Sequence, residues 1–164
     1  MALAELLLGV GQSRNRDNNL SSAVPTGQAT RTVLPRLGQD AFSRSVKTNY
    51  GNRCCFPGCT IDDDAFLVGS HIARWADAPD LRGHVDNGLA LCLMHDRAFE
   101  MGIFTLDHKF AVVIRNQTLK STWAKETIGK FSGHPIRRGL VTPSLDALRR
   151  HWIRNSYKGS EGGG

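Results

Sequence analysis

The sequence predicts one domain of the α+β class, with helices flanking short strands, and three observations support this. Phe42, Val46 and Tyr50 recur every four residues, which is the spacing of one helical face. Residues 65–73, AFLVGSHIA, form an apolar, β-prone run. Residues 142–157, TPSLDALRRHWIRNSY, carry a second helical pattern. A chain of 164 residues has the length of a single domain with a modest additional element.

The N-terminal region, residues 1–36, is predicted to be an extension or linker. Its first residues, MALAELLLGVG, resemble a signal peptide, but they include Glu5 and no positively charged start. We therefore interpret them as a short helix or a frayed terminus. Residues 13–31 are polar and contain Pro25 and Gly27, which predicts a loop.

The folded domain is placed at residues 37–158. Its first helix carries Phe42 and is expected to end at Gly51. The apolar run 65–73 predicts a strand carrying His71, and the polar residues 76–86 predict a loop.

The second half of the domain begins with LALCLMHDRAFEMG, residues 89–102, which has the composition of a helix that Gly102 terminates. Residues 103–115 predict two short strands around a turn at Asp107 and His108.

The last predicted element is a C-terminal helix, and Pro143 and Ser144 supply its start signal. Its apolar stripe is predicted to contain Leu145, Leu148, Trp152 and Ile153. Residues 159–164, rich in glycine, are expected to be a disordered tail.

The charge balance favours a polyanionic partner. The chain has 21 Lys and Arg against 15 Asp and Glu, a formal net charge of +6. A solvated basic surface without such a partner is the alternative. No apolar run is long enough to span a bilayer, so no membrane partner is expected.

The cysteines lie in two groups that suggest a metal site. Cys92 and His95 have C-x-x-H spacing, and Cys59 follows Cys54 and Cys55 at looser spacing. A tetrahedral zinc ion takes four such ligands from two short loops. Disulfides are less expected because no signal peptide accompanies the cysteines, which favours zinc in a reducing compartment. Buried free cysteines are the structural alternative.

Several ordered motifs within residues 37–158 resemble the HNH endonucleases, most closely those associated with bacterial restriction, including the McrA type. They are GQDAFSRSVKTNYGNRC, GSHIARW, NGLALCLMHD, AFEMG and the closing SLDALRRHWIRNSYKG. The resemblance implies a ββα-metal (HNH, or His-Me finger) core with a structural zinc knuckle and flanking N- and C-terminal helices. In that family a β-hairpin followed by a helix holds one divalent metal.

The register of the motif separates two neighbouring residues. In zinc-containing relatives the metal-site histidine lies nine residues after the asparagine and directly follows the last zinc ligand. Counting nine from Asn87 gives Asp96, so His95 corresponds to the zinc ligand. The resemblance thus implies a structural zinc set of Cys54 (or Cys55), Cys59, Cys92 and His95.

The same register gives a catalytic set of His71, Asn87 and Asp96. A neutral imidazole accepts protons near neutral pH, so His71 is the candidate general base. The resemblance implies that Asn87 orients this histidine and that Asp96 holds Mg²⁺, Mn²⁺ or another divalent metal against the scissile phosphate. Taken singly, each has a structural alternative: a core histidine, a turn asparagine before Gly88, and a solvated helix carboxylate.

The chain departs from the family at two further positions. Ser70 stands where many relatives have a metal-binding aspartate, and Glu100 stands where the family has aspartate. Trp75 is expected to be a core anchor. Three arginines flank the motif and are candidates for phosphate binding, with plain surface charge as the alternative: Arg74, Arg82 and Arg97.

The resemblance implies a metal-dependent endonuclease acting on double-stranded DNA, in restriction or another defence function, in a bacterial-type cytoplasm. Cleavage of both strands is compatible with a homodimer, because one HNH site cuts one strand. The presence of Asp96 instead of histidine motivates one alternative, a catalytically weakened, zinc-stapled DNA-binding module. A nuclease toxin is a second alternative with the same chemistry.

Overall fold

The computed structural model describes residues 27–28, 38–115 and 119–157, and the account below concerns these. They belong almost entirely to a compact unit, Pro35–Gly164, which is distinct from a first unit, Met1–Leu34. The predictions for the chain start and for the tail at 159–164 fall outside the described residues. No helix in the described part combines the length and apolarity that a membrane crossing requires.

The first helix, α1 (Gln39–Asn49), forms as its four-residue pattern predicted. Phe42, Val46 and Tyr50 are all buried. Gly51 follows the helix with a φ of 64°, a left-handed conformation that glycine adopts without steric cost.

A β-hairpin lies at the centre of the domain. β1 (Leu67–His71) pairs antiparallel with β2 (Gly88–Cys92), and His71 is opposite Gly88. Before β1 comes the 3₁₀ turn η1 (Asp64–Phe66). The predicted strand at 65–73 is therefore confirmed in its central part. The long connection between the strands contains two further 3₁₀ turns, η2 (Pro79–Leu81) and η3 (Val85–Asn87).

The helix predicted from residue 89 begins later than expected. Residues 88–92 form strand β2, and the helix α2 spans only Leu93–Glu100. All five residues of β2 are buried, and such a run has no periodicity that separates a strand from a buried helix. Pairing with β1 decides the outcome. Gly102, with a φ of 64°, follows the helix as predicted.

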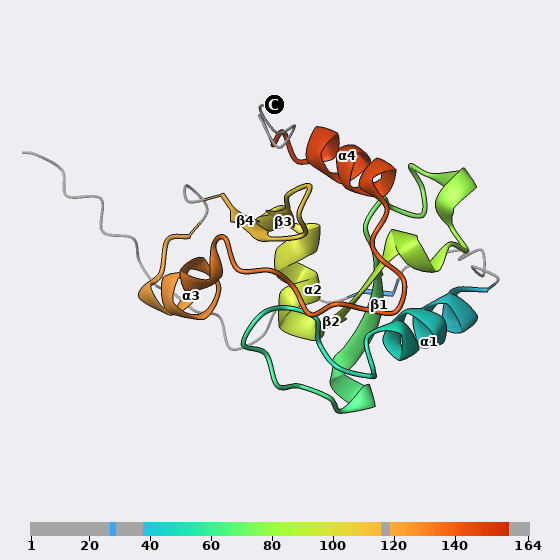
Figure 1. Cartoon of the computed structure of the whole chain (residues 1–164), viewed down its shortest axis with the longest axis horizontal. Helices are drawn as coiled ribbons and strands as arrows, with labels where there is room; N and C mark the ends of the chain where they lie inside the picture. Colours follow the sequence, from blue (N-terminus) through green and yellow to red (C-terminus); the bar gives the residue numbers. More distant parts are fainter. Residues whose placement is uncertain (1–26, 29–37, 116–118, 158–164) are drawn as a thin grey trace, which may run out of the picture. The chain divides into compact units, whose positions relative to one another are not determined.

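Two glycines bring α1 directly against this hairpin (Figure 1). A Cβ on Gly69 would lie 2.6 Å from Ser43 Cα, and one on Gly88 would lie 2.3 Å from Val46 Cγ2. The Ser43 hydroxyl accepts a hydrogen bond from the Gly69 amide at 3.1 Å. The close approach of α1 to the hairpin therefore depends on the absence of a side chain at Gly69 and at Gly88.

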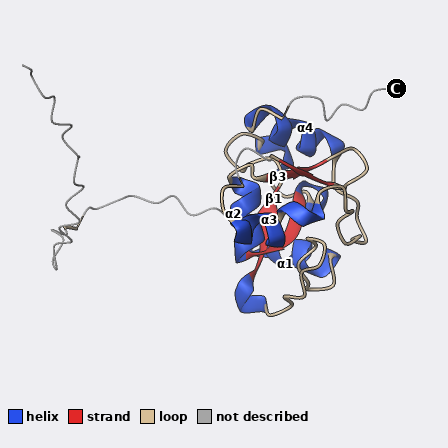
Figure 2. Cartoon of the chain, turned by 90° about the vertical axis from the view of Figure 1, so that its left-hand side faces the viewer, coloured by secondary structure: helices blue, strands red, loops and turns tan. Residues whose placement is uncertain are grey.

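The second half of the domain adds a further hairpin and two helices, and the C-terminal helix lies beside the first strand of this hairpin (Figure 2). β3 (Phe104–Leu106) and β4 (Val112–Ile114) form the predicted antiparallel pair. A helix that the sequence analysis missed, α3 (Thr122–Thr127), leads into the 3₁₀ turn η5 (Gly129–Phe131). Together the elements confirm a mixed α+β fold with two small antiparallel sheets.

The C-terminal helix α4 (Leu145–Arg154) begins as predicted, with the Ser144 hydroxyl accepting a hydrogen bond from the Ala147 amide. Its predicted apolar stripe is half wrong. Leu148 and Trp152 are buried, but Leu145 and Ile153 are exposed, Ile153 by 80%. The buried face includes Ala147 and His151 instead. His151 was missed because a lone histidine gives no apolar signal.

Candidate functional site

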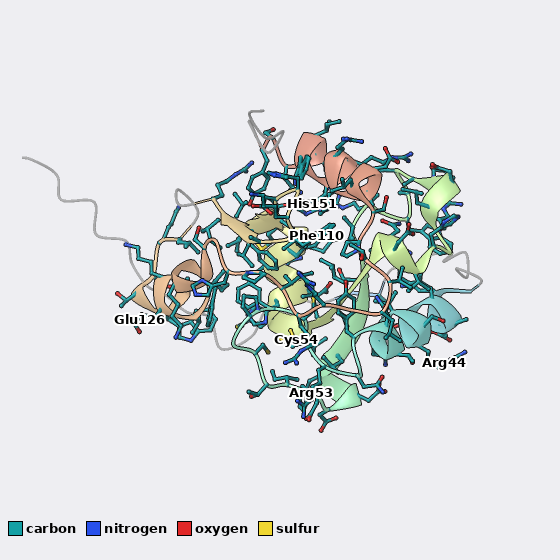
Figure 3. The ribbon with its side chains drawn as sticks, viewed as in Figure 1. Arg44, Arg53, Cys54, Phe110, Glu126 and His151 are labelled. Carbon is teal, nitrogen blue, oxygen red and sulfur yellow. The ribbon has the colours of Figure 1, made fainter. Side chains whose placement is uncertain are left out.

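Three cysteines and one histidine converge in the core beside α2. The metal-binding atoms of Cys54, Cys59, Cys92 and His95 all lie within 4.8 Å of one another. His95 Nδ1 lies 3.5 Å from Cys54 Sγ and 3.1 Å from Cys92 Sγ. Figure 3 shows Cys54 at one end of α2, the end at which Cys92 and His95 enter the cluster. The structure therefore brings together the four residues that the sequence grouped in pairs.

The direction of the side chains decides whether Cys54 or Cys55 belongs to the metal-binding cluster. Both are buried, but Cys55 is not part of the four-residue group. The backbone of Cys55 is held on both sides: its amide donates to the Ala90 carbonyl, and its carbonyl accepts from the Arg137 amide, both at 2.8 Å. Cys54 Sγ meanwhile accepts from the Cys92 amide at 3.3 Å.

The donor set of this cluster fits zinc. Three thiol groups and one imidazole are a common tetrahedral zinc set. The hydrogen bond with Cys54 lowers the pKa of Cys92, which favours the thiolate form that binds a metal. The His95 ring stacks on Phe56 at 3.9 Å, and His95 Nε2 is buried without a hydrogen-bond partner, which leaves Nδ1 as the nitrogen facing the sulfur atoms.

A separate open groove of about 540 Å³ lies along β1 and α2. Its lining includes Gln39, Ser70, His71, Trp75, Asp96 and Glu100. His71 and Asp96, predicted from the sequence as catalytic, thus face one groove. Gln39 was missed; its place at the first position of α1, in the GQ motif, is the signal that pointed there.

His71 is held in one orientation. Its ring stacks on Phe42 at 3.8 Å and meets Trp75 edge-on at 5.7 Å. His71 Nε2 lies 3.0 Å from the Arg82 carbonyl oxygen. A carbonyl only accepts, so Nε2 carries the proton and Nδ1 holds the lone pair in the neutral ring. Nδ1 is therefore the nitrogen that can accept a proton.

Asn87 is fully buried, and its side chain binds the backbone of the connection between the strands. Its Oδ1 accepts from the Ala73 amide at 2.8 Å. Its Nδ2 donates to the carbonyls of Ala73 and Leu81, at 3.2 and 3.1 Å. The bond to Leu81 fixes the chain one residue before Arg82, whose carbonyl holds His71. The side chain of Asn87 is therefore connected to the His71 contact only through this loop.

Asp96 lies in the first half of α2 and is half-buried. Burial raises the pKa of its carboxyl, and the nearby charge of Glu100 acts in the same direction. A hydrogen bond from the Ser70 hydroxyl opposes this by favouring the charged form. A carboxylate poised in this way is a suitable ligand for a hard divalent cation.

The three candidate arginines differ in their partners. Arg74 pairs with Glu100 at 3.2 Å, and Glu100 also approaches Arg154 at 3.6 Å. Arg82 lies with its guanidinium 5.0 Å from the centre of the Trp75 ring, and its Nε donates to the Trp75 carbonyl at 2.7 Å.

Arg97 is exposed, and its charge acts to lower the Asp96 pKa. Of the three arginines, Arg82 is thus the one whose side chain packs back onto its own loop, against Trp75.

Comparisons with known proteins give a family match and a similar solved structure. Residues 54–107 match the family model described as HNH endonuclease. One similar solved structure is described as a "Modification dependent TagI restriction endonuclease", with 22% sequence identity and a TM-score of 0.46. The match covers 74% of this chain and 40% of that one, so the chain spans less than half the length of that protein. No curated protein matches the chain.

Proposed function

We propose that this chain hydrolyses phosphodiester bonds in double-stranded DNA with a divalent metal. The premise is its membership of the HNH endonuclease family, through residues 54–107. The observation that carries the proposal is the shared groove of His71 and Asp96. A proton acceptor can activate the attacking water. A carboxylate can hold the cation that would stabilise the negative charge on the phosphate and on the leaving oxygen, which then takes a proton from water.

In the proposed mechanism His71 is the general base. Its Nε2–H is held by the Arg82 carbonyl, so Nδ1 accepts the proton of the attacking water. The Phe42 and Trp75 rings restrict rotation of the imidazole. Asn87 keeps the Arg82 segment in register through its bonds to Ala73 and Leu81, and is therefore a positioning residue.

Asp96 would hold Mg²⁺, Mn²⁺ or another divalent ion, with the Ser70 hydroxyl orienting the carboxylate. Such an ion supplies stabilisation of the negative charge that develops on the phosphate. The zinc ion proposed for Cys54, Cys59, Cys92 and His95 has a structural role, because all four ligand positions come from the protein.

Plasmid nicking tests this proposal. Supercoiled plasmid is incubated with the protein and Mg²⁺, Mn²⁺, Co²⁺ or Ni²⁺. The expected result is conversion to open circles with at least one metal, reduced by at least about 100-fold in His71→Ala. His84→Ala is the matched control, because His84 is an exposed histidine outside the groove. Nicking that survives in His71→Ala would contradict the assignment.

One alternative is favoured by a specific observation. Asp96 occupies the position where the family has histidine, and burial raises its pKa, which weakens metal binding at low pH. A zinc-stapled DNA-binding module would bind duplex DNA and nick it with none of the four metals. A role in restriction or other defence, and a cytoplasmic location, rest on the motif resemblance. A toxin would share the chemistry, and its genomic neighbours would distinguish it.

A further inference from the structure

A second cavity, of about 200 Å³, lies outside the catalytic groove and shares none of its lining residues. It is lined by the turn between β3 and β4 and by the segment that leads from η5 to α4. Figure 1 shows the course of the chain in both segments. Its main residues are Lys109, Phe110, Arg137, Arg138, Thr142 and Pro143. We propose that this basic pocket binds the backbone of the DNA duplex at a distance from the cleaved bond. The inference rests on the proposed action on DNA.

The charges around the basic pocket have no counterions in the described part of the chain. Lys109, Arg137 and Arg138 form none of the ion pairs found there, and no lining residue is acidic. Other cations of the domain, such as Arg74 and Arg150, are paired with carboxylates. Three unpaired cations at one hollow are the chemistry that binds phosphate.

The backbone of the basic pocket is fixed. The Asp107 carboxylate accepts from the amides of Lys109 and Ala111, both at 2.8 Å, which closes the turn. The Ile136 amide donates a hydrogen bond to the Phe110 carbonyl at 3.0 Å, and the Arg137 amide donates one to the Cys55 carbonyl at 2.8 Å. The cations are therefore presented from a preformed frame and not from a loose loop.

The less exposed part of the pocket lining is apolar. Ile136 and Pro143 are buried and Phe110 is half-buried, whereas the three cations are exposed. Phe110 adopts a φ of 61°, a left-handed conformation that is unfavourable for a bulky residue. Such strain is retained where the surrounding structure imposes it, and it often marks a functional position. Apolar side chains beside exposed cations and the Thr142 hydroxyl suit a deoxyribose and its phosphate.

Helix α1 extends from the catalytic groove to the segment that lines the basic pocket. Gln39 at its start lines the groove, while Asn49 at its end holds the segment beside the pocket. Asn49 exchanges two side-chain hydrogen bonds with Val141, and a Cβ on Gly139 would lie 2.6 Å from Asn49 Nδ2. The helix spans about 15 Å, which corresponds to roughly four or five nucleotides of duplex.

Salt-dependent DNA binding tests the inference. Binding of a 20-bp duplex (about two helical turns) is measured at several salt concentrations with the proteins in a His71→Ala background. Replacing Lys109 and Arg138 with glutamine should weaken binding about tenfold and reduce the slope of log K against log salt by roughly two. The loss of two phosphate contacts is the expected cause.

The matched control replaces Lys125 and Arg149 with glutamine, since both are exposed and lie outside either cavity. It removes the same net charge and should leave the slope within about 0.5 of the parent value. Equal changes in both double variants, or no change in either, would overturn the proposal. Circular dichroism and zinc content verify that each variant is folded. If the double variant misfolds, the single variants Lys109→Gln and Arg138→Gln are measured instead, and each is expected to reduce the slope by about one.

Two further outcomes have a defined meaning. If inorganic phosphate stabilises the parent protein but not the double variant, while both bind DNA with the same slope, the pocket serves a free phosphate ligand and the proposal is wrong. If the protein with His71 intact nicks no plasmid but the slope difference persists, the proposed hydrolysis fails and the DNA-binding pocket stands.

Discussion

His95 and Asp96 are neighbours in the chain but serve different sites. Consecutive residues of an α-helix point about 100° apart, so one can face the sulfur cluster while the next faces the groove. His95 is buried against Phe56, and Asp96 lines the groove with Ser70. A single helical step therefore separates the proposed structural ion from the proposed catalytic ion.

Substitution of Asp96 should affect catalysis and leave the zinc. Asp96→Ala is expected to reduce Mg²⁺-dependent nicking by at least about 100-fold, because the carboxylate ligand is lost, and to retain one zinc per chain. Asp96→His should shift the preference among Mg²⁺, Mn²⁺, Co²⁺ and Ni²⁺. Nicking rates and elemental analysis measure both effects. Unchanged activity and metal preference in Asp96→His would show that the register of the helix is wrong.

Arg82 gives a second prediction, because its side chain is engaged with Trp75 while its carbonyl holds His71. Arg82→Ala should loosen the loop and reduce the nicking rate about tenfold, with DNA affinity and its salt slope unchanged. A residue that bound phosphate would instead reduce the slope by about one. Arg97→Gln, an exposed arginine near Asp96, is the comparison. A lower slope in Arg82→Ala would contradict the positioning role.

At the level of elements, the periodic segments were predictable and the apolar run at residues 88–92 was not. The spacing of Phe42, Val46 and Tyr50 defines α1, and Ser144 marks the start of α4. Residues 88–92 are buried on all sides, so only the pairing with β1 shows that they form a strand.

For the site, motif order and residue type grouped His71, Asn87 and Asp96, and the structure places His71 and Asp96 on one groove. Spacing could not choose between Cys54 and Cys55, because side-chain direction depends on the fold. The contact of the Arg82 side chain with Trp75 was also beyond the sequence, since Arg82 lies in a polar loop without periodicity.

The contact between α1 and the hairpin predicts a sharp difference between two glycines. Gly69→Ala should lower the free energy of unfolding by about 1–3 kcal/mol, because the new Cβ would meet the Ser43 backbone at 2.6 Å. Gly83→Ala has no atom within 4 Å of its Cβ and should change stability by less than about 0.5 kcal/mol. Denaturant unfolding measures both. Equal stabilities would mean that the helix does not lie so close to β1.

The docking of α4 should depend on pH through His151, which Figure 3 labels between α4 and the β3–β4 hairpin. Burial lowers the pKa of His151 to about 3, and its ring nitrogens contact the Thr105 hydroxyl on β3 and the Phe99 carbonyl on α2. In the unfolded chain a histidine titrates near 6.5, so between these values the unfolded state binds more protons. The stabilisation is therefore complete above about pH 6.5 and declines as pH falls towards 3.

The slope from this one group is at most about 1.4 kcal/mol per pH unit. Unfolding free energies at pH 7 and pH 5 in the parent and in His151→Gln isolate it, because other titrating groups are common to both proteins. The parent should lose more stability than the variant. The same pH dependence in both proteins would contradict the burial of a neutral histidine.

For the whole molecule, the sulfur cluster joins segments that are distant in sequence. Cys54 and Cys59 come from the chain before the hairpin, Cys92 ends β2, and His95 lies in α2. The carbonyl of Cys55 also holds the segment of the basic pocket through Arg137. A zinc ion in this cluster would thus hold the hairpin, helix α2 and the basic pocket in fixed positions relative to one another.

We propose two different metal sites side by side in this domain, of which only one is catalytic. Anomalous scattering from crystals grown with Mn²⁺, recorded at the zinc and manganese edges, tests this proposal most directly. We predict a zinc peak among Cys54, Cys59, Cys92 and His95 and a separate manganese peak at Asp96, beside His71. A single metal bound by both His95 and Asp96, or manganese without contact to Asp96, would contradict the presence of two separate sites.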